Sequence, residues 1–316
     1  MFLWLKDMRQ TMLISVVICT YNRSESLKET LESLLNIDLD GSFNHEILVV
    51  DNNSHDDTSK IVKLLAPKFQ ASLRYIFEKR QGKCHALNVG ISESKGDVIA
   101  FTDDDVSFNK DYLNQIARAF RDCGPAAGFA GGKIIPRWMG EKPDWVYGPF
   151  LGPLALLDYG DQSLILNAQM KNLKSRLFYG ANLIVRKKLF DKHGGFDLEK
   201  KVAEDTEICL RFYAAGEVGL YDPSVVVHHK VPVARTRPEY FYKWFFEQGK
   251  YRERAAIFDK KIYYPFGVPT WLIRHTIVLC LKSFLKKDQH SRIYCRCLAF
   301  FNLGQIRKFL TDKKKV

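Results

Sequence analysis

The stretch "MLISVVICTYNR", residues 12–23, decides the fold class. Its apolar run is nearly unbroken and rich in β-branched residues, which is typical of a strand buried on both faces of a sheet. The next segment, "SESLKETLESLL" (24–35), carries leucines at helical spacing, with Ser24 as its candidate N-cap. A buried strand followed directly by an amphipathic helix predicts an α/β protein.

The same pair of elements recurs through the first part of the chain. Further strands are expected over 45–53, 73–79 and 97–105, and further helices over 56–66, 82–94 and 110–120. Four strand–helix repeats predict a mostly parallel central sheet flanked by helices on both faces. The second half is less regular, with strands expected over 128–136, 176–190 and 225–232, and helices over 203–216 and 238–258.

Composition predicts a packed globular protein, because 46% of the 316 residues are hydrophobic and 13% are aromatic. The net charge of +12 is uneven, since residues 250–316 hold 16 Lys/Arg against 4 Asp/Glu. We therefore expect a catalytic domain over 1–250 and a basic, helical C-terminal region over 251–316. The segment 269–287, "PTWLIRHTIVLCLKSFLKK", is too short to span a bilayer. It can lie on an anionic membrane surface or pack on the domain.

Cysteine usage indicates a reducing compartment. The seven cysteines are scattered, their number is odd, and "MFLWLK" at the start is too short for a signal sequence. We expect a cytoplasmic protein, peripheral on the inner face of the plasma membrane if the basic region binds lipid. Neither G-x-G-x-x-G nor a P-loop follows the first strand, which disfavours a dehydrogenase-type dinucleotide fold and a P-loop enzyme. Without a nucleic-acid-binding module, we expect no nucleic-acid partner.

Polar residues follow three of the expected strands, as "TYNR", "DNNS" and "TDDD". The carboxyl ends of parallel strands meet at one edge of a sheet, so these residues should converge there. Asp103 and Asp105 can then face one ion, and two carboxylates suit Mg²⁺ or Mn²⁺. The alternative is a solvated turn that caps the next helix. Asp104, between them, is expected to tolerate substitution best.

Four other features suit chemistry, each with a structural alternative. Asp51 can accept from a base or a ribose hydroxyl, or form an Asx turn. Arg80 and Lys83 suit phosphate near a helix start, or are surface charges. Glu204 and Asp205, at another helix start, suit a general base, or cap that helix. His228 and His229 point to opposite faces of a strand, so at most one of them can reach a metal.

These segments together resemble a known family. The motifs "SVVICTYNR", "VVDNNSHDDT", "RQGKCHALNVGI", "GDVIAFTDDDV", "YGANLIVRKKLFDKHGGFD" and "AEDTEICLRFYAAG" occur in the order found in family 2 glycosyltransferases of the GT-A fold. The resemblance covers roughly residues 12–250. It implies an inverting transferase that moves a sugar from a nucleoside diphosphate donor, usually UDP-linked, with Mn²⁺ or Mg²⁺ as cofactor. A glycan or lipid-linked acceptor in cell-surface polysaccharide synthesis is the expected second substrate.

The resemblance also implies roles for individual residues. Asp205 matches the catalytic base, with Glu204 beside it, and Asp103 and Asp105 match the D-x-D motif that binds ribose, metal and diphosphate. His229 fits the histidine that completes the metal site in some members. The nucleotide site would include Thr20, Tyr21, Asn22, Arg23, Asp51, Asn53, Arg80, Lys83, Asp103 and Asp104. Gly180, Ala181 and Asn182 fall near the acceptor and donor sugar, and Arg235 and Arg237 could meet the diphosphate.

Two departures and two rival functions remain. The Q-x-x-R-W motif of processive synthases is replaced by "EQGKYRER" (247–254), which favours transfer of one sugar per encounter. The last 60 residues or so match no motif of the family. A sugar-phosphate nucleotidyltransferase would also place carboxylates at a strand end, but it usually has a glycine-rich basic loop after its first strand, unlike "TYNRSES". A non-catalytic nucleotide-sugar-binding protein is the other alternative, and the intact aspartates argue against it.

Overall fold

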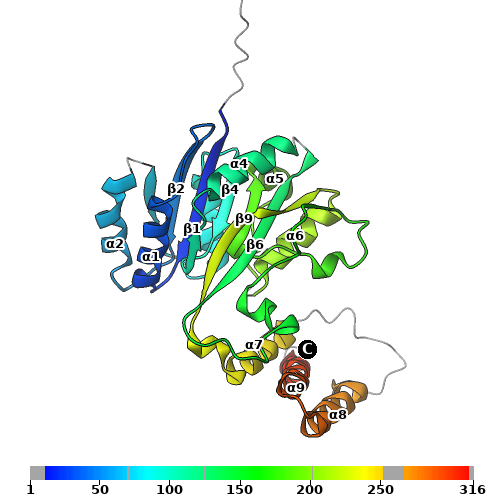
Figure 1. Cartoon of the computed structure of the whole chain (residues 1–316). Helices are drawn as coiled ribbons and strands as arrows, with labels where there is room; N and C mark the ends of the chain where they lie inside the picture. The colour runs from blue at the N-terminus through cyan, green and yellow to red at the C-terminus, as the bar shows by residue number, and fades with distance from the viewer. Residues whose placement is uncertain (1–10, 70–71, 124–125, 201, 252–266, 313–316) are drawn as a thin grey trace, which may run out of the picture. The chain divides into compact units, whose positions relative to one another are not determined.

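The computed structural model describes residues 11–69, 72–123, 126–200, 202–251 and 267–312, and the chain divides into two compact units (Figure 1). The first unit holds Met1–Arg137 and Ala155–Lys230, and the second holds Trp138–Leu154 and Val231–Val316. All strands of the sheet belong to the first unit, apart from the final residues of β6 and β9.

Four parallel strands build one half of a nine-stranded sheet, whose order is β3-β2-β1-β4-β8-β6-β9-β5 with β7 paired to β9. The strand β1 (Leu13–Thr20) lies between β2 (Asn44–Asp51) and β4 (Val98–Thr102), and β3 (Leu73–Phe77) pairs with β2. Val16, Val17 and Ile18 of β1 are fully buried, which confirms the expected strand covered on both faces.

The other half of the sheet is antiparallel, so the sheet as a whole is mixed. The pairs are β4 with β8 (Leu183–Arg186), β8 with β6 (Phe129–Trp138), and β9 (Gly219–Val231) with both β5 (Val106–Phe108) and β7 (Leu164–Leu166). The sequence did not reveal β5 and β7, because three residues are too few to show an alternating pattern.

The helices of the first unit largely follow their predicted positions. The helix α1 (Ser24–Leu35) has the predicted bounds and buries Leu27, Leu31 and Leu34. Four others agree with prediction to within two residues at each end: α2 (Thr58–Leu65), α3 (Lys83–Glu93), α4 (Tyr112–Asp122) and α6 (Glu204–Ala214). The prediction of one strand over 176–190 was wrong, because after β8 the chain forms α5 (Lys187–His193), which buries Leu189 and Phe190.

The second unit is helical, with α7 (Pro238–Tyr251), α8 (Thr270–Leu285) and α9 (Gln289–Asp312). The helix α9 contacts both α7 and α8 (Figure 1). It crosses α7 closely, because Gly249 lies against the Phe301 carbonyl and Gly304 against the Phe246 carbonyl, where any Cβ would clash. Among the described residues, none of the helices has the length and apolar character required to cross a bilayer.

Candidate functional site

The candidate site lies where the parallel strands end. Thr20, the last residue of β1, pairs in register with Asp51, the last residue of β2, and β4 ends beside them at Thr102. Immediately after Thr102, the chain turns through Asp103–Asp105 into β5. The polar strand ends predicted from the sequence therefore do meet at one edge of the sheet.

Asp104 holds this turn in place through contacts with β1 and the residues after it. It is 3% exposed, its Oδ2 accepts a hydrogen bond from Thr20 Oγ1 at 2.7 Å, and its Oδ1 pairs with Arg23 Nη1 at 2.5 Å. Burial raises the pKa of Asp104 to about 6, with Arg23 acting in the opposite direction. The expectation that Asp104 tolerates substitution best does not fit these contacts. Both of its oxygens hold protein groups, which suits it to fixing the turn.

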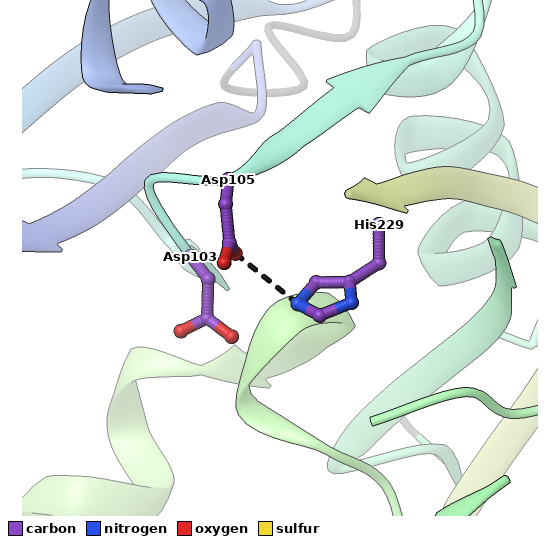
Figure 2. A group of neighbouring side chains, drawn as sticks. All are labelled: Asp103, Asp105 and His229. Carbon is purple, nitrogen blue, oxygen red and sulfur yellow. Dashed lines mark ion pairs between the residues drawn. The ribbon is translucent and has the colours of Figure 1, made fainter. Parts of the chain in front are cut away.

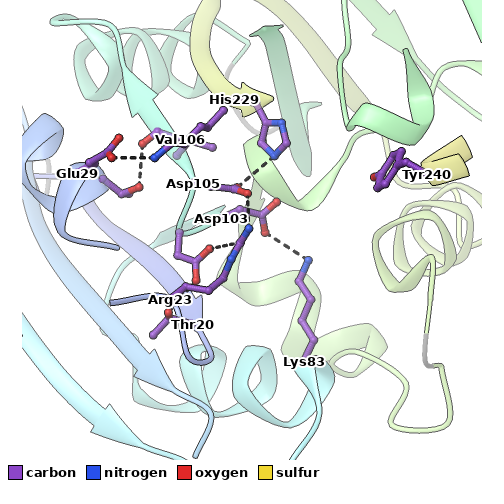
Figure 3. A network of polar contacts seen from close by, with 12 residues as sticks. Thr20, Arg23, Glu29, Lys83, Asp103, Asp105, Val106, His229 and Tyr240 are labelled. Atoms are coloured by element: carbon purple, nitrogen blue, oxygen red, sulfur yellow. Dashed lines mark hydrogen bonds and ion pairs between the residues drawn. The ribbon is translucent and has the colours of Figure 1, made fainter. Parts of the chain in front are cut away.

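Asp103, Asp105 and His229 bring possible metal-ligand atoms within 4.8 Å of one another (Figure 2). His229 Nε2 lies 3.1 Å from Asp105 Oδ1, and Arg23 Nη2 lies 2.9 Å from Asp105 Oδ2 (Figure 3). The histidine arrives there because β9 pairs with β5, with Val106 opposite His229. Its neighbour His228 instead contacts Asn109 Oδ1 at 2.9 Å, so the cluster includes only one of the two histidines.

The donor set of this cluster fits a divalent ion. Two carboxylates are hard oxygen ligands of the kind that Mg²⁺ and Mn²⁺ prefer, and an imidazole shifts the preference toward a first-row transition metal such as Mn²⁺. His229 is 2% exposed, and among the described residues its Nδ1 atom has no hydrogen-bond partner. The nitrogen that faces Asp105 is Nε2, so Nε2 is the atom of His229 that the cluster offers to an ion.

Lys83 connects this cluster to a second pair of carboxylates. Its Nζ atom lies 3.3 Å from Asp103 Oδ1 and 2.9 Å from Glu204 Oε1. Burial would lower the pKa of Lys83, but Asp103, Glu204 and Asp205 outweigh it and raise the pKa well above its usual value. Lys83 is therefore a permanent cation between the two acidic groups. Arg80, predicted beside it, instead makes a two-point ion pair with Glu78.

The second pair of carboxylates sits in the first turn of α6. Asp205 Oδ2 accepts a hydrogen bond from the Gly180 N–H at 3.0 Å, and its Oδ1 accepts one from the Thr206 N–H at 2.7 Å. Loss of solvation and the neighbouring Glu204 raise the pKa of Asp205 to about 6, while Lys83 acts to lower it. For Glu204, Lys83 outweighs burial, and its pKa is lowered.

Both carboxylate groups border one cavity. Its lining includes Cys19, Lys83, Asp103, Gly180, Glu204 and Asp205. Burial raises the pKa of the Cys19 thiol, so this residue is a neutral, unreactive part of the wall. The wall of this cavity therefore combines a carboxylate of the cluster, a lysine cation and a carboxylate with a raised pKa.

The segment 180–182 contributes less to the cavity than the resemblance implied. Asn182 is 1% exposed, accepts a hydrogen bond from the Tyr112 hydroxyl, and donates to the carbonyls of Lys133 and Val225. Ala181 is also 1% exposed. Both residues therefore fix the chain behind the site, and Gly180 is the residue of the three that lines it.

The loops after β1 and β2 are joined by hydrogen bonds of Asn22, and each loop contains an asparagine in the left-handed conformation. Asn22 (φ 51°) receives a hydrogen bond from the His55 N–H and donates its own N–H to Ser54, while Asn53 has φ 66°. Asp51 accepts from the Ser54 N–H, three residues further on, and from the Tyr75 hydroxyl, so its carboxylate binds protein groups, although the spacing is not that of the Asx turn considered from sequence. Tyr21, beside them, is 44% exposed.

Three residues of the site region were missed by the sequence reasoning. Glu29 of α1 pairs with Arg137 at 2.5 Å and with Lys230 at 2.7 Å. Lys230 follows His229, and its N–H donates to the Asp105 carbonyl. These contacts join residues more than 100 positions apart, so no local sequence pattern predicts them. Of the predicted residues, Arg235 and Arg237 lie in the second unit, just before α7.

Comparison with known proteins gives one family match. The family described as "Glycosyl transferase family 2" matches residues 15–194. The chain is 26% identical over 249 residues to the succinoglycan biosynthesis protein ExoM of Rhizobium meliloti, covering 76% of this chain and 74% of the relative. It is also 26% identical over 248 residues to a glucosyl-dolichyl phosphate glucuronosyltransferase of Haloferax volcanii, covering 75% of each.

Solved structures share the fold. A mannosyltransferase from Pyrobaculum calidifontis in complex with GDP-Man and Mn²⁺ superposes with a TM-score of 0.65 at 20% identity, over 96% of this chain and 89% of that one. Residues 1–349 of TarS from S. aureus, in complex with UDP, give a TM-score of 0.57 at 18% identity, over 96% and 92% of the two chains. Both likenesses confirm the expected α/β GT-A architecture.

Proposed function

The chain belongs to glycosyl transferase family 2, and we propose that it moves one sugar at a time from a nucleoside diphosphate donor, in the first instance UDP-linked, to an acceptor hydroxyl. The acceptor would be a glycan or lipid-linked glycan in cell-surface polysaccharide synthesis. The relatives support this choice, since one is named for succinoglycan biosynthesis and another for a dolichyl phosphate-linked sugar.

The observation that carries the proposal is that Lys83 lies between two acidic groups with different environments. Asp103 and Asp105 belong to the cluster with His229, and Asp205 lies at the start of α6. Lys83 contacts Asp103 on one side and Glu204 on the other. A transferase needs one group to hold the charged leaving diphosphate and another to receive the acceptor proton, and this arrangement supplies both.

Asp103, Asp105 and His229 would hold Mn²⁺ or Mg²⁺. When bound, the ion would supply positive charge for the diphosphate that leaves. Lys83 adds a protein cation beside it, and its permanently charged state suits it to a phosphate oxygen. Arg23 keeps Asp105 oriented through its 2.9 Å contact with Oδ2. Asp104 and Thr20 in turn hold Arg23 and the turn in place.

Asp205 would act as the general base toward the acceptor hydroxyl. The Gly180 N–H fixes one of its oxygens, and the carboxylate faces the same cavity as Asp103. A pKa of about 6 makes it a stronger base than an ordinary aspartate, yet it is mostly ionised at neutral pH. One displacement assisted by one base inverts the anomeric carbon, so we propose an inverting reaction.

We also place the protein in the cytoplasm, with its basic C-terminal region at the inner face of the plasma membrane. A lipid-linked acceptor would present its sugar at that surface. The excess of 16 Lys/Arg over 4 Asp/Glu in residues 250–316 supports an attraction to anionic lipid.

A donor screen tests the proposal. Purified protein is offered UDP-, GDP- and dTDP-sugars with Mn²⁺ or Mg²⁺, and both nucleotide binding and nucleotide diphosphate release are measured. We expect binding that depends on the metal and release of UDP, and we expect Asp105→Ala to lose the metal-dependent part of binding. A protein that binds no nucleotide sugar is not a glycosyltransferase of this kind. Pyrophosphate release from a nucleoside triphosphate and a sugar phosphate would instead identify a nucleotidyltransferase.

A further inference from the structure

The helix α8 has one buried face and, on its opposite side, an apolar face that the described residues leave largely exposed. Leu272, Thr276, Leu279 and Ser283 form the face that is buried in the second unit. On the opposite side of the helix, Ile277, Leu281, Phe284 and Leu285 are 55%, 60%, 76% and 80% exposed. An apolar helix face normally packs against a core or contacts lipid.

This exposure is concentrated in one place. With Trp271 and Val278, each 42% exposed, α8 carries six exposed large apolar side chains within 15 residues, from 271 to 285. In the first unit, exposed large apolar side chains stand singly in the sequence, such as Leu64 of α2 and Ile165 of β7, and α9 carries a smaller and less exposed group, Phe300, Leu303 and Leu310. Scattered residues need no explanation, but a contiguous exposed apolar patch marks an interaction surface.

The charges around the patch select its partner. Arg274 and Lys282 lie on α8 itself, Lys286 and Lys287 follow its end, and all four are exposed. Residues 270–287 include no Asp or Glu. A second copy of the chain docked face to face on α8 would bring these cations against the same cations, and within residues 270–288 Asp288 is the single carboxylate that could pair them. An anionic bilayer complements both the apolar side chains and the lysines.

The geometry sets how the helix meets the bilayer. Its 16 residues span roughly 24 Å, less than the hydrocarbon thickness of about 30 Å. The two most exposed side chains, Phe284 and Leu285, lie at its C-terminal end, directly before Lys286 and Lys287. Apolar side chains followed by lysines suit shallow insertion, with the lysines at the level of the lipid phosphates.

We infer that the exposed face of α8, residues 271–285, together with Lys286 and Lys287, docks the protein on an anionic phospholipid surface, with Phe284 and Leu285 inserted into it. The inference specifies which part of the basic C-terminal region touches lipid. It depends neither on the sugar donor nor on the metal, so it stands or falls separately from the proposed reaction.

Co-sedimentation of the full chain with vesicles tests the inference. Phosphatidylcholine vesicles with and without phosphatidylglycerol are the probes. We expect strong binding only to the anionic vesicles, reduced at least about tenfold in Phe284→Ser/Leu285→Ser and to a similar degree in Lys286→Glu/Lys287→Glu. High salt should weaken the binding of the unaltered protein. Leu64→Ser/Ile165→Ser, which removes two exposed apolar side chains of the first unit, is the matched control and should bind as the unaltered protein does.

Three outcomes overturn the inference. Equal vesicle binding by the α8 variants and the control would place the lipid contact elsewhere. A dimer that Phe284→Ser/Leu285→Ser converts to a monomer, seen by light scattering, would show that a second copy covers the face. A loss of thermal stability in that variant, absent from the control, would show that another segment of the same chain packs there. Unchanged melting and a monomer that loses vesicle binding would support the inference.

Discussion

The turn after β4 and the first turn of α6 both place neighbouring acidic residues in the site, but they neutralise them differently. At the β4 turn, Arg23 pairs with Asp104 and Asp105, and His229 contacts Asp105. At α6, Lys83 contacts Glu204, whereas the hydrogen bonds to Asp205 from the described part of the chain come from two backbone N–H groups, those of Gly180 and Thr206. The β4 turn is therefore suited to keeping its carboxylates charged, whereas the first turn of α6 is suited to accepting a proton on Asp205.

The most sensitive test of the difference between the two regions is to replace the two acidic residues of α6 one at a time. Asp205→Asn should lower kcat about 10³-fold with donor affinity retained, because the base is gone but the donor contacts remain. Glu204→Gln should lower kcat far less. Steady-state kinetics and donor titration measure both. Equal losses in the two variants would remove the distinction between Asp205 and its neighbour.

The same Asp205→Asn substitution should also stabilise the fold. Because folding raises the pKa of Asp205 to about 6, its ionised form opposes folding at neutral pH. The destabilisation caused by ionised Asp205 is absent below the ordinary aspartate pKa of about 4 and reaches its full size above pH 6. We expect a gain on the order of 1 kcal/mol in the free energy of unfolding at pH 7, and almost none at pH 4, by urea titration.

The β4 turn should respond in the opposite way. Arg23→Met leaves Asp104 buried without its ion pair, and should cost about 1–2 kcal/mol at pH 7, since the guanidinium is partly exposed. Arg23 acts to lower the pKa of Asp104, so the cost should shrink as pH falls and the carboxyl takes up a proton. Arg118→Met, which loses a hydrogen bond to neutral Ser224, is the control. A cost independent of pH would contradict this account.

A pH profile sharpens the comparison further. The acid limb of kcat should lie near pH 6, set by Asp205, with activity rising as that group loses its proton. Glu204→Gln should move the limb to lower pH, because the Glu204 charge raises the pKa of Asp205. Lys83→Met should move it to higher pH, because that cation lowers it. Shifts of the same sign in both variants would refute the assignment of the limb to Asp205.

The smallest effect concerns Glu29. Glu29→Gln loses ion pairs with Arg137 and Lys230, both partly exposed, and should cost no more than about 1 kcal/mol of stability. Because Lys230 adjoins His229, we also expect about threefold weaker Mn²⁺ binding, measured by calorimetry. Glu25→Gln, an exposed position on the same helix, is the control. Unchanged Mn²⁺ affinity would limit Glu29 to a structural role.

Local patterns predicted the parallel half of the sheet well. The buried run of β1 and the leucine spacing of α1 encode their own structure, so α1 has the expected bounds and β1 lies within the expected run 12–23. The antiparallel half was harder, because β5 and β7 are too short for a pattern and α5 continues an apolar run that also suits a strand. Periodicity cannot separate a short helix from a strand in such a run.

The candidate site was predictable in position but less so in role. Strand ends and the six ordered motifs located Asp103, Asp105 and Asp205, and the two-residue period of β9 left one histidine for the cluster. The burial of Asp104 and the internal hydrogen bonds of Asn182 were not predictable, because both depend on partners distant in sequence. The same holds for Arg80, whose expected phosphate role competes with an ion pair to Glu78.

The contacts that assemble the site also determine when it can form. Thr20 reaches Asp104 across 84 residues, Arg23 reaches Asp105 across 82, and Glu29 reaches Lys230 across 201. Such long-range contacts close large loops and so form slowly, whereas α1 needs only local contacts to form. During refolding from urea, helical circular dichroism should therefore return before nucleotide binding does, and the interval between the two signals would report how late the sheet edge closes.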